Sequence, residues 1–198
     1  DYCFYADEAN IRATADYGMM SRAVSHALIE KAAGAAQGSV SFLFQGGEPT
    51  LAGLDFYRDF AAYVKETFPS GLAVQYAIQT NGIVLDEAWC RFFKENGFLV
   101  GLSLDGSRKC HDRFRRDGSG EGTYDRVLRA ARLMDGAGVE YNVLTVVTGY
   151  LAGHTRNVFS SLCRNGFRFQ QYIPCLDPME EEQGRQEYSL SPKQYEEI

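Results

Sequence analysis

Short apolar runs alternate with amphipathic segments along most of the chain, and this alternation constrains the possible folds more than any other feature. Five runs have the length and the Val, Ile, Phe and Tyr content of strands: 40–44, 73–78, 98–104, 141–147 and 167–173. Segments with apolar residues three and four positions apart lie before or between them, at about 19–36, 57–68, 124–134 and 155–164, with another around Trp89. Several strand-like runs are almost continuously apolar, which is typical of parallel strands buried on both faces.

Glycines mark three of the places where a helix gives way to a strand. Gly97, Gly138 and Gly166 each stand at the end of an amphipathic segment and directly before an apolar run. Glycine readily adopts the left-handed backbone conformation that commonly ends a helix. Asp86 and Ser191 are of the type that caps the first turn of a helix. The sequence therefore predicts an α/β sheet or barrel whose parallel strands are joined by helical crossovers.

Composition excludes two classes of partner. The chain has 198 residues, 45% of them apolar, and 20 Lys and Arg residues against 26 Asp and Glu residues give a net charge of −6. This size suits one domain, or most of a larger one. No apolar run approaches the ~18 residues that a membrane span needs. An acidic chain without blocks of Lys or Arg is poorly suited to nucleic-acid phosphates. We therefore expect neither a membrane nor a nucleic acid as a partner.

The five cysteines indicate the compartment. They form no C-x-x-C pair, their number is odd, and no basic stretch followed by an apolar stretch opens the chain. We therefore expect a reducing, cytoplasmic location and no disulfide scaffold. Cys90 and Cys163 are expected on the apolar faces of helices, and Cys110 in a loop. Neither Cys110 nor Cys175 has a partner at metal-ligand spacing, and His111 is as suited to capping or packing as to chemistry.

Polar residues and glycines cluster where each predicted strand ends, at 45–49, 79–82, 103–106, 145–148 and 170–174. The carboxyl ends of parallel strands face the same way and together build the ligand sites of α/β folds. Each cluster by itself could equally be a plain turn, and Asn81-Gly82 could be a hairpin signal. Five such clusters together favour a ligand site.

Two motifs resemble those of radical S-adenosylmethionine (SAM) enzymes. Gly46-Gly47-Glu48-Pro49 follows a predicted strand and resembles their methionine-binding motif. Tyr2-Cys3-Phe4-Tyr5 resembles the end of their C-x3-C-x2-C iron–sulfur motif, with Cys3 as the third cysteine. The motifs at 79–82, 103–106, 111–115, 142–147 and 171–178 narrow the resemblance to the anaerobic sulfatase-maturating enzymes, also called arylsulfatase regulators. The resemblance covers nearly the whole chain.

The resemblance implies a partial (β/α)6 TIM-like radical SAM barrel, with parallel strands, the site at their C-terminal ends and the first strand missing. Residues 1–176 would be a partial radical SAM core domain. Residues 177–198 would be an acidic linker and the start of a helix that leads to a C-terminal iron–sulfur domain outside this sequence. Two of the three cluster cysteines would lie before Asp1. We therefore expect a fragment that has no catalytic residue of its own and is inactive by itself.

The same resemblance assigns residues to a 4Fe–4S cluster, to SAM and to a substrate. Cys3 would be a cluster ligand, since three cysteines hold three irons and leave the fourth iron open to SAM. The implied SAM-binding residues are Tyr2 and the backbone at Leu176 beside the adenine, Gly47 and Glu48 at the amino group, and Ser103 and Arg115 at the ribose and carboxylate end. Tyr5 and Gln45 would face the substrate peptide.

The activity that the resemblance implies is the maturation of sulfatases. A 5′-deoxyadenosyl radical would take a hydrogen from Cβ of a Cys or Ser in an unfolded sulfatase polypeptide, and oxidation would give Cα-formylglycine. An electron donor such as a flavodoxin or ferredoxin would be a second partner. Three alternatives stay open: a radical SAM enzyme that modifies another class of peptide, a non-catalytic regulator that binds sulfatases, and a metal-free (β/α) enzyme such as an aldolase. The last alternative lacks a lysine at the predicted strand ends.

Overall fold

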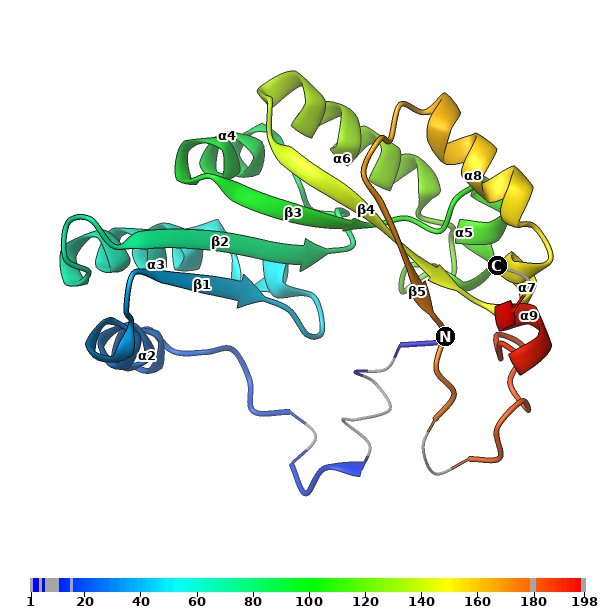
Figure 1. Cartoon of the computed structure of the whole chain (residues 1–198), viewed down its shortest axis with the longest axis horizontal. Coiled ribbons are helices and arrows are strands. Elements are labelled where there is room, and N and C mark those ends of the chain that lie inside the picture. The colour runs from blue at the N-terminus through cyan, green and yellow to red at the C-terminus, as the bar shows by residue number, and fades with distance from the viewer. Residues whose placement is uncertain (1, 4, 6–10, 15, 179–180, 197–198) are drawn as a thin grey trace.

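The fold is a strongly twisted sheet of five parallel strands that curls into a half-barrel (Figure 1). The computed structural model describes residues 2–3, 5, 11–14, 16–178 and 181–196. The strands are β1 (Ser39–Phe44), β2 (Ala73–Thr80), β3 (Phe98–Ser103), β4 (Glu140–Val147) and β5 (Gln170–Pro174). Each strand pairs in parallel with the next, so the order in the sheet is the order in the sequence. The predicted parallel α/β fold is confirmed.

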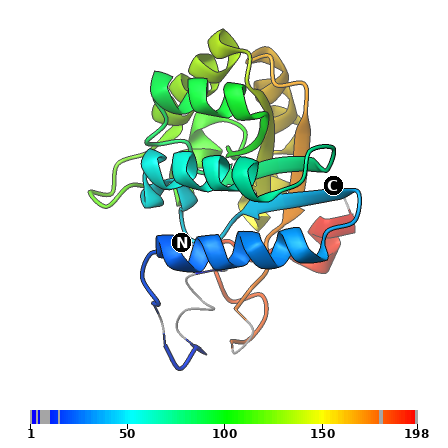
Figure 2. The same cartoon turned by 90° about the vertical axis from the view of Figure 1, so that its left-hand side faces the viewer.

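Helices cover one face of the sheet, as the side view shows (Figure 2). The longer helices are α2 (Arg22–Ala35), α3 (Leu54–Thr67), α4 (Glu87–Asn96), α6 (Tyr124–Ala137) and α8 (Thr155–Arg164). The shorter helices η1 (Pro49–Ala52), α5 (Arg108–Phe114) and α7 (Gly149–Ala152) follow the carboxyl ends of β1, β3 and β4, and α9 (Pro192–Glu196) contacts α7. The other face of the sheet is open, and Leu43 and Leu99 on it are 62% and 49% exposed.

Aromatic side chains on neighbouring strands form the centre of the core beneath the helices. The strand register puts Phe42 of β1 beside Tyr76 of β2, and Tyr76 beside Phe98 of β3. These rings stack with centroids 6.1 and 4.9 Å apart, and Phe60 of α3 meets Phe42 edge-on at 5.1 Å. Such ring pairs stabilise a core beyond the apolar area that they bury. The packing holds β1, β2 and β3 in register, and it thereby places their carboxyl ends.

The predicted helix boundaries are confirmed where a capping residue marks them. Asp86 caps α4, because its side chain accepts a hydrogen bond from the Trp89 amide at 3.0 Å. Gly97 and Gly138 end α4 and α6 in the left-handed conformation, with φ of 64° and 67°. These ends depend only on residues near one another in the sequence, which is why the sequence predicts them.

Three predictions of local structure are wrong. β5 begins at Gln170 instead of residue 167, since the amide of Phe167 bonds the Leu162 carbonyl and completes the end of α8. Cys110 is buried in α5 instead of lying in a loop; this helix has only seven residues and shows no clear amphipathic repeat in the sequence. Cys163 is exposed, because α8 buries the preceding Leu162 and turns the next side chain outward.

The described residues that follow β5 pack against α7. The amide of Gly149 donates to the Tyr188 carbonyl at 3.0 Å, and the Gln194 side chain donates to the Gly149 carbonyl at 3.1 Å. Ser189 also donates to the carboxylate of Asp177 at 2.7 Å. The segment around Tyr188 therefore lies against the carboxyl edge of the sheet. The division between a core domain ending at residue 176 and a linker after it stays a prediction.

Gly106, directly after β3, provides a test of the packing against α8. Its φ is +70°, and a Cβ there would lie 2.5 Å from a methyl carbon of Val158. Gly97 has a similar φ of +64°, and a Cβ there would meet no atom within 4 Å. We expect Gly97→Ala to lower the free energy of unfolding by about 1 kcal/mol from backbone strain alone. Gly106→Ala should lower it by about 3 kcal/mol, since overpacking adds to the strain. Urea unfolding of both variants measures the difference, and equal losses would contradict the close packing.

Candidate active site

A pocket of about 440 Å³ lies at the carboxyl ends of the strands. Its walls come from the ends of all five strands and from residues near the amino terminus. The residues that line it include all nine that the sequence analysis assigned to the cluster, SAM or substrate: Tyr2, Cys3, Tyr5, Gln45, Gly47, Glu48, Ser103, Arg115 and Leu176. The fold therefore brings together residues from positions 2 to 176. What each of them binds is a separate, proposed assignment.

Two glycines shape the loop that follows β1. Gly46 and Gly47 have φ of +104° and +54°, which glycine adopts far more readily than other residues. A Cβ on Gly46 would lie 3.5 Å from the ring of Tyr5, whereas a Cβ on Gly47 would meet no atom within 4 Å. The open space beside Gly47 is part of the pocket. A ligand can therefore approach the backbone of this loop closely.

Glu48 joins the loop after β1 to the end of β2. Its Oε1 accepts hydrogen bonds from the Thr50 amide at 3.1 Å, the Thr50 hydroxyl at 2.5 Å and the Thr80 hydroxyl at 2.7 Å. Its Oε2 accepts one from the Asn81 amide at 2.8 Å. Glu48 thereby caps η1 and holds two loops of the pocket together. Since Oε2 takes a single bond from the described residues, it retains acceptor capacity for a cationic group of a ligand.

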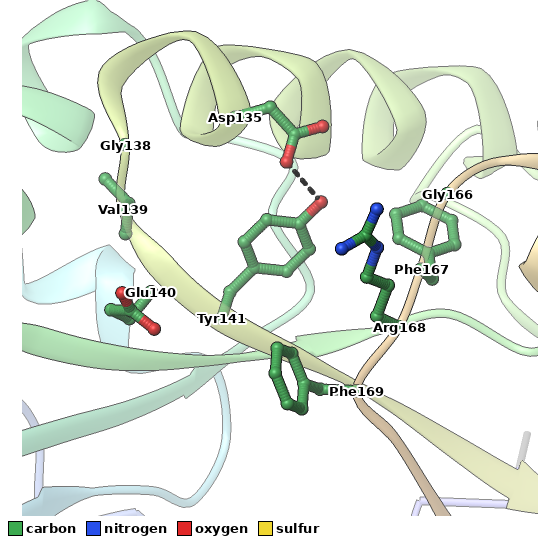
Figure 3. A pocket seen from close by; sticks show the side chains of 9 residues that line it. All are labelled: Asp135, Gly138, Val139, Glu140, Tyr141, Gly166, Phe167, Arg168 and Phe169. Atoms are coloured by element: carbon green, nitrogen blue, oxygen red, sulfur yellow. Dashed lines mark hydrogen bonds between the residues drawn. The ribbon is translucent and has the colours of Figure 1, made fainter.

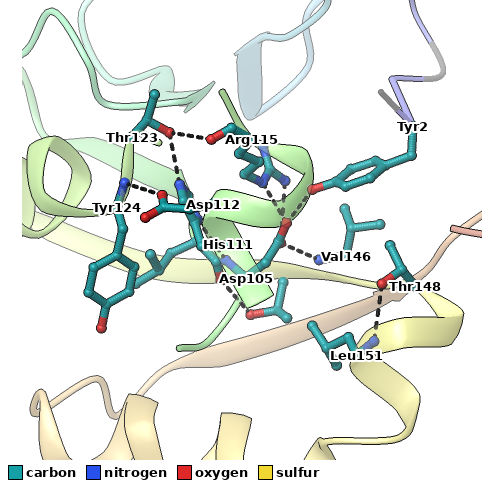
Figure 4. Close-up of polar contacts among 12 residues, drawn as sticks. Tyr2, Asp105, His111, Asp112, Arg115, Thr123, Tyr124, Val146, Thr148 and Leu151 are labelled. Atoms are coloured by element: carbon teal, nitrogen blue, oxygen red, sulfur yellow. Dashed lines mark hydrogen bonds and ion pairs between the residues drawn. The ribbon is translucent and has the colours of Figure 1, made fainter. Parts of the chain in front are cut away.

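Asp105, which the sequence analysis left without a role, is the centre of a second set of contacts (Figure 4). Its carboxylate is 3% exposed and accepts from Arg115 Nε at 2.7 Å and from the Val146 amide at 2.9 Å. The hydroxyl of Tyr2 also donates to it. Burial alone lowers the pKa of Arg115, but the adjacent Asp105 carboxylate outweighs burial and raises it. Burial and the same carboxylate raise the pKa of Tyr2. Arg115 is therefore a cation and Tyr2 a neutral phenol.

His111 is buried next to this set and has a structural role. Its Nδ1 accepts from the Asp105 amide at 3.2 Å, so in the neutral ring Nε2 carries the proton and donates to the Thr123 hydroxyl at 2.9 Å. Thr123 in turn donates to the Arg115 carbonyl at 3.1 Å. Burial lowers the pKa of His111 to about 4. The neutral ring therefore holds the loop after β3 to the end of α5, which agrees with a packing role.

A second pocket, of about 330 Å³, lies at the opposite edge of the sheet (Figure 3). It is formed at the amino ends of β4 and β5, where the Tyr141 hydroxyl donates to Asp135 at 2.8 Å. None of the residues that the sequence assigned to a site lines it. Ligands of open parallel sheets bind at the carboxyl ends of the strands. We therefore take the 440 Å³ pocket as the candidate active site.

The described residues do not form a complete metal site. Within the ranges that the structure describes, no group of three or more His, Cys, Asp or Glu side chains could hold a metal ion. Cys3 is exposed and lines the pocket, so it can supply one ligand. Cys175 also lines the pocket, but burial, with Asp177 and Asp105 nearby, raises its pKa to about 12, so it is a protonated thiol. Among the helices of the described part, none is both long and apolar enough to cross a membrane.

Residues 1–160 match the family model of the radical SAM superfamily. The chain belongs to this superfamily. It is 42% identical over 195 residues to the cysteine-type anaerobic sulfatase-maturating enzyme of Clostridium novyi (strain NT), covering 98% of this chain and 52% of the relative. It is 34% identical over 175 residues to the serine-type enzyme of Klebsiella aerogenes, covering 88% of this chain and 43% of that relative.

A solved structure described as native anSMEcpe with bound AdoMet and Kp18Cys peptide is also similar to the chain. It matches with a TM-score of 0.93 at 41% sequence identity, over 99% of this chain and 52% of that chain. The chain thus spans about half the length of the curated relatives that it matches. Its five-stranded half-barrel is the fold expected from the resemblance.

The chemistry of the pocket fits SAM, the cofactor of the superfamily. The Arg115 guanidinium suits a carboxylate, and the Glu48 carboxylate suits an ammonium group, so the pocket offers both charges that an amino-acid group needs. Ser103 contributes a hydroxyl that can bond a ribose. The volume of about 440 Å³ lies within the range of small-molecule sites. A 4Fe–4S cluster is likewise expected in this superfamily, and Cys3 is the described residue suited to it.

The buried His111 gives the site a testable pH dependence. Its pKa of about 4 in the folded protein lies below the ordinary value of 6.5, so the unfolded chain binds a proton at higher pH than the folded one. The stability from the neutral ring is present above pH 6.5 and is lost as the pH falls toward 4. The variant His111→Gln keeps an acceptor and a donor but cannot titrate. Between pH 7 and pH 4.5, we expect the free energy of unfolding of the wild type to fall by about 2–3 kcal/mol more than that of His111→Gln. Urea unfolding at the two pH values measures this, and equal losses would contradict a neutral buried His111.

Proposed function

We propose that the chain is the SAM-binding part of an enzyme that oxidises a cysteine or serine of sulfatases to Cα-formylglycine. The observation that carries the proposal is the single pocket at the carboxyl edge of the sheet, which gathers all nine residues that the family resemblance assigns to the cluster, SAM or substrate. The proposal is supported by the 42% identity to a cysteine-type sulfatase-maturating enzyme. It is also supported by the fold match to a structure described as holding AdoMet and a peptide.

In this proposal the walls of the pocket bind the two ends of SAM. Arg115 and Ser103 hold the carboxylate and ribose, and Glu48 Oε2 and the backbone of Gly47 meet the ammonium group. The ring of Tyr2 and the backbone at Leu176 border the adenine. The contacts of Glu48 with Thr50, Thr80 and Asn81 support this arrangement, because they hold the carboxylate in place before a ligand arrives.

Cys3 is the proposed cluster ligand, and Tyr5 and Gln45 face the substrate. Both Tyr5 and Gln45 are exposed and line the pocket, which is compatible with contact to a polypeptide. When bound, the cluster and SAM supply a carbon-centred radical that removes a hydrogen from the substrate Cβ. The part of the protein described here binds and orients SAM, and it surrounds the reacting groups with a partly buried wall.

The remaining parts of the proposal concern the longer protein. We propose that residues 1–176 belong to a radical SAM core domain and residues 177–198 to a linker that leads to a C-terminal iron–sulfur domain. The cysteine-type substrate is favoured, since identity is 42% to the cysteine-type relative and 34% to the serine-type relative. A flavodoxin or ferredoxin supplies electrons, and the reducing cytoplasm is the compartment in which the free cysteines of the described part persist.

The decisive experiment uses the whole product of the gene that encodes this chain, reconstituted anaerobically with iron and sulfide. It is incubated with SAM, a reductant and a peptide containing C-x-P-x-R, and 5′-deoxyadenosine and peptide mass are measured together. We expect 5′-deoxyadenosine and the mass loss that accompanies conversion of the thiol to an aldehyde. The matched controls are the same peptide with Ser or Ala in place of Cys, and we expect the Ala peptide to be unmodified.

The possible results separate the candidate functions. Formation of 5′-deoxyadenosine with an unchanged peptide would retain the radical chemistry and contradict the sulfatase substrate. A cluster-loaded protein that forms neither product but binds the peptide would favour a non-catalytic sulfatase-binding regulator. Modification of the Ser peptide in preference to the Cys peptide would overturn the cysteine-type assignment.

A further inference from the structure

Asp105 receives hydrogen bonds from three separate segments of the chain. Arg115, at the end of α5, approaches through Nε at 2.7 Å and Nη2 at 3.4 Å. The amide of Val146 in β4 donates to Oδ1 at 2.9 Å, and the hydroxyl of Tyr2, near the amino terminus, donates to Oδ2. Each carboxylate oxygen therefore accepts two hydrogen bonds. Its carboxylate is thus occupied by groups of the protein itself, and Asp105 is absent from the residues that line the pocket.

The two side chains that Asp105 holds do line the pocket. Arg115 donates to Asp105 through Nε and Nη2, which uses two of its five N–H groups, and its side chain lines the pocket. The Arg115 guanidinium carbon lies 5.3 Å from the centroid of the Tyr2 ring, a distance at which a cation and an aromatic face attract each other. Tyr2 and Arg115 are thus placed against each other, and both are bonded to the same buried carboxylate (Figure 4).

Asp105 and Arg115 form an ion pair that is largely shielded from water. The Arg115 side chain is 21% exposed and that of Asp105 is 3% exposed. A guanidinium in such a place is costly without a paired anion, and removal of one partner from a buried pair destabilises the other. Without Asp105, the guanidinium would turn toward solvent or toward other acceptors. Its position beside the pocket therefore depends on Asp105.

We propose that Asp105 is a positioning residue for SAM: it holds the guanidinium of Arg115 and the ring of Tyr2 in the geometry that binds the ligand, without contacting the ligand itself. This inference rests on the proposed function, because it requires SAM to occupy the pocket. The inference gives Asp105 a role in SAM binding that it performs through its neighbours, as the outer partners of ligand-binding groups do.

The structure supplies a matched control. Asp125 on α6 forms an ion pair with Arg108, with Nη1 to Oδ2 at 2.6 Å, but the Asp125 side chain is 68% exposed and lies outside the pocket. An exposed pair of this kind contributes little to stability. Asp125→Asn thus removes a carboxylate from an arginine ion pair outside the pocket. Asp105→Asn removes the carboxylate that pairs with Arg115, a residue that lines the pocket.

The test measures the dissociation constant of SAM by equilibrium dialysis, without reductant, on the cluster-loaded whole gene product. We expect Asp105→Asn to raise the dissociation constant about tenfold, the lower end of the effect of losing an outer partner. Asp125→Asn should leave it unchanged. If wild-type protein does not bind SAM, the proposed function fails and this inference fails with it. If the wild type binds SAM and Asp105→Asn binds equally well, the inference alone is overturned.

A double-mutant cycle separates positioning from general destabilisation. Arg115→Lys removes the group through which Asp105 is proposed to act. Asp105→Asn should therefore weaken SAM binding much less in the Arg115→Lys background than in the wild type. Additive effects on the dissociation constant would overturn the inference that Asp105 positions Arg115, since they would show that Asp105 acts independently of Arg115.

Tyr2→Phe keeps the proposal falsifiable if Asp105→Asn does not fold. It removes only the hydroxyl, and the ring keeps its edge-on contacts with Phe114 and Tyr188, at 5.9 and 6.2 Å. We expect a roughly threefold rise in the dissociation constant of SAM, in keeping with the loss of one hydrogen bond. A folded Tyr2→Phe protein with wild-type affinity would overturn the inference in that case.

Discussion

Every feature of the site depends on the pairing of five parallel strands in the order in which they occur in the sequence. Parallel pairing puts the carboxyl end of each strand at one edge, so residues as distant as Gln45 and Leu176 line a single pocket. The register matters as much as the order. Side chains alternate between the two faces of a strand, and a slip of β3 by one residue would turn Ser103 away from the pocket. The stacked rings of Phe42, Tyr76 and Phe98 oppose such a slip.

Two carboxylates convert this edge of the sheet into a rigid ligand site. Glu48 links the loop after β1 to the end of β2, and Asp105 links the end of β3 to β4 and α5. A carboxylate that leaves water must be compensated by donors, and each of these two accepts four hydrogen bonds. In the part of the chain that the structure describes, no buried side-chain nitrogen or oxygen lacks a hydrogen-bond partner. The site can therefore hold opposite charges close to an apolar core.

What the sequence predicts about this protein depends on the range of the interactions involved. The α8 boundaries and the Asp86 cap depend on neighbours within a few positions, and both are predicted correctly. The candidate site residues lie in short motifs, so their presence in one pocket could be anticipated from the family resemblance. Asp105 lies in one of those motifs, but its proposed role depends on Arg115, 10 positions away, and on Tyr2, 103 positions away. Local patterns carry no information about that convergence.

Tyr2 links the proposed SAM site to Cys3, the proposed cluster ligand. Its hydroxyl is bonded to Asp105, and its ring packs between Phe114 and Tyr188, so segments from the start, middle and end of the chain meet at one side chain. The next residue is Cys3, the proposed cluster ligand. Since adjacent Cα atoms are a fixed ~3.8 Å apart, the contacts that place Tyr2 also restrict the position of Cys3. In the proposed function, the residues that shape the pocket would therefore also help to place Cys3, which would hold the cluster.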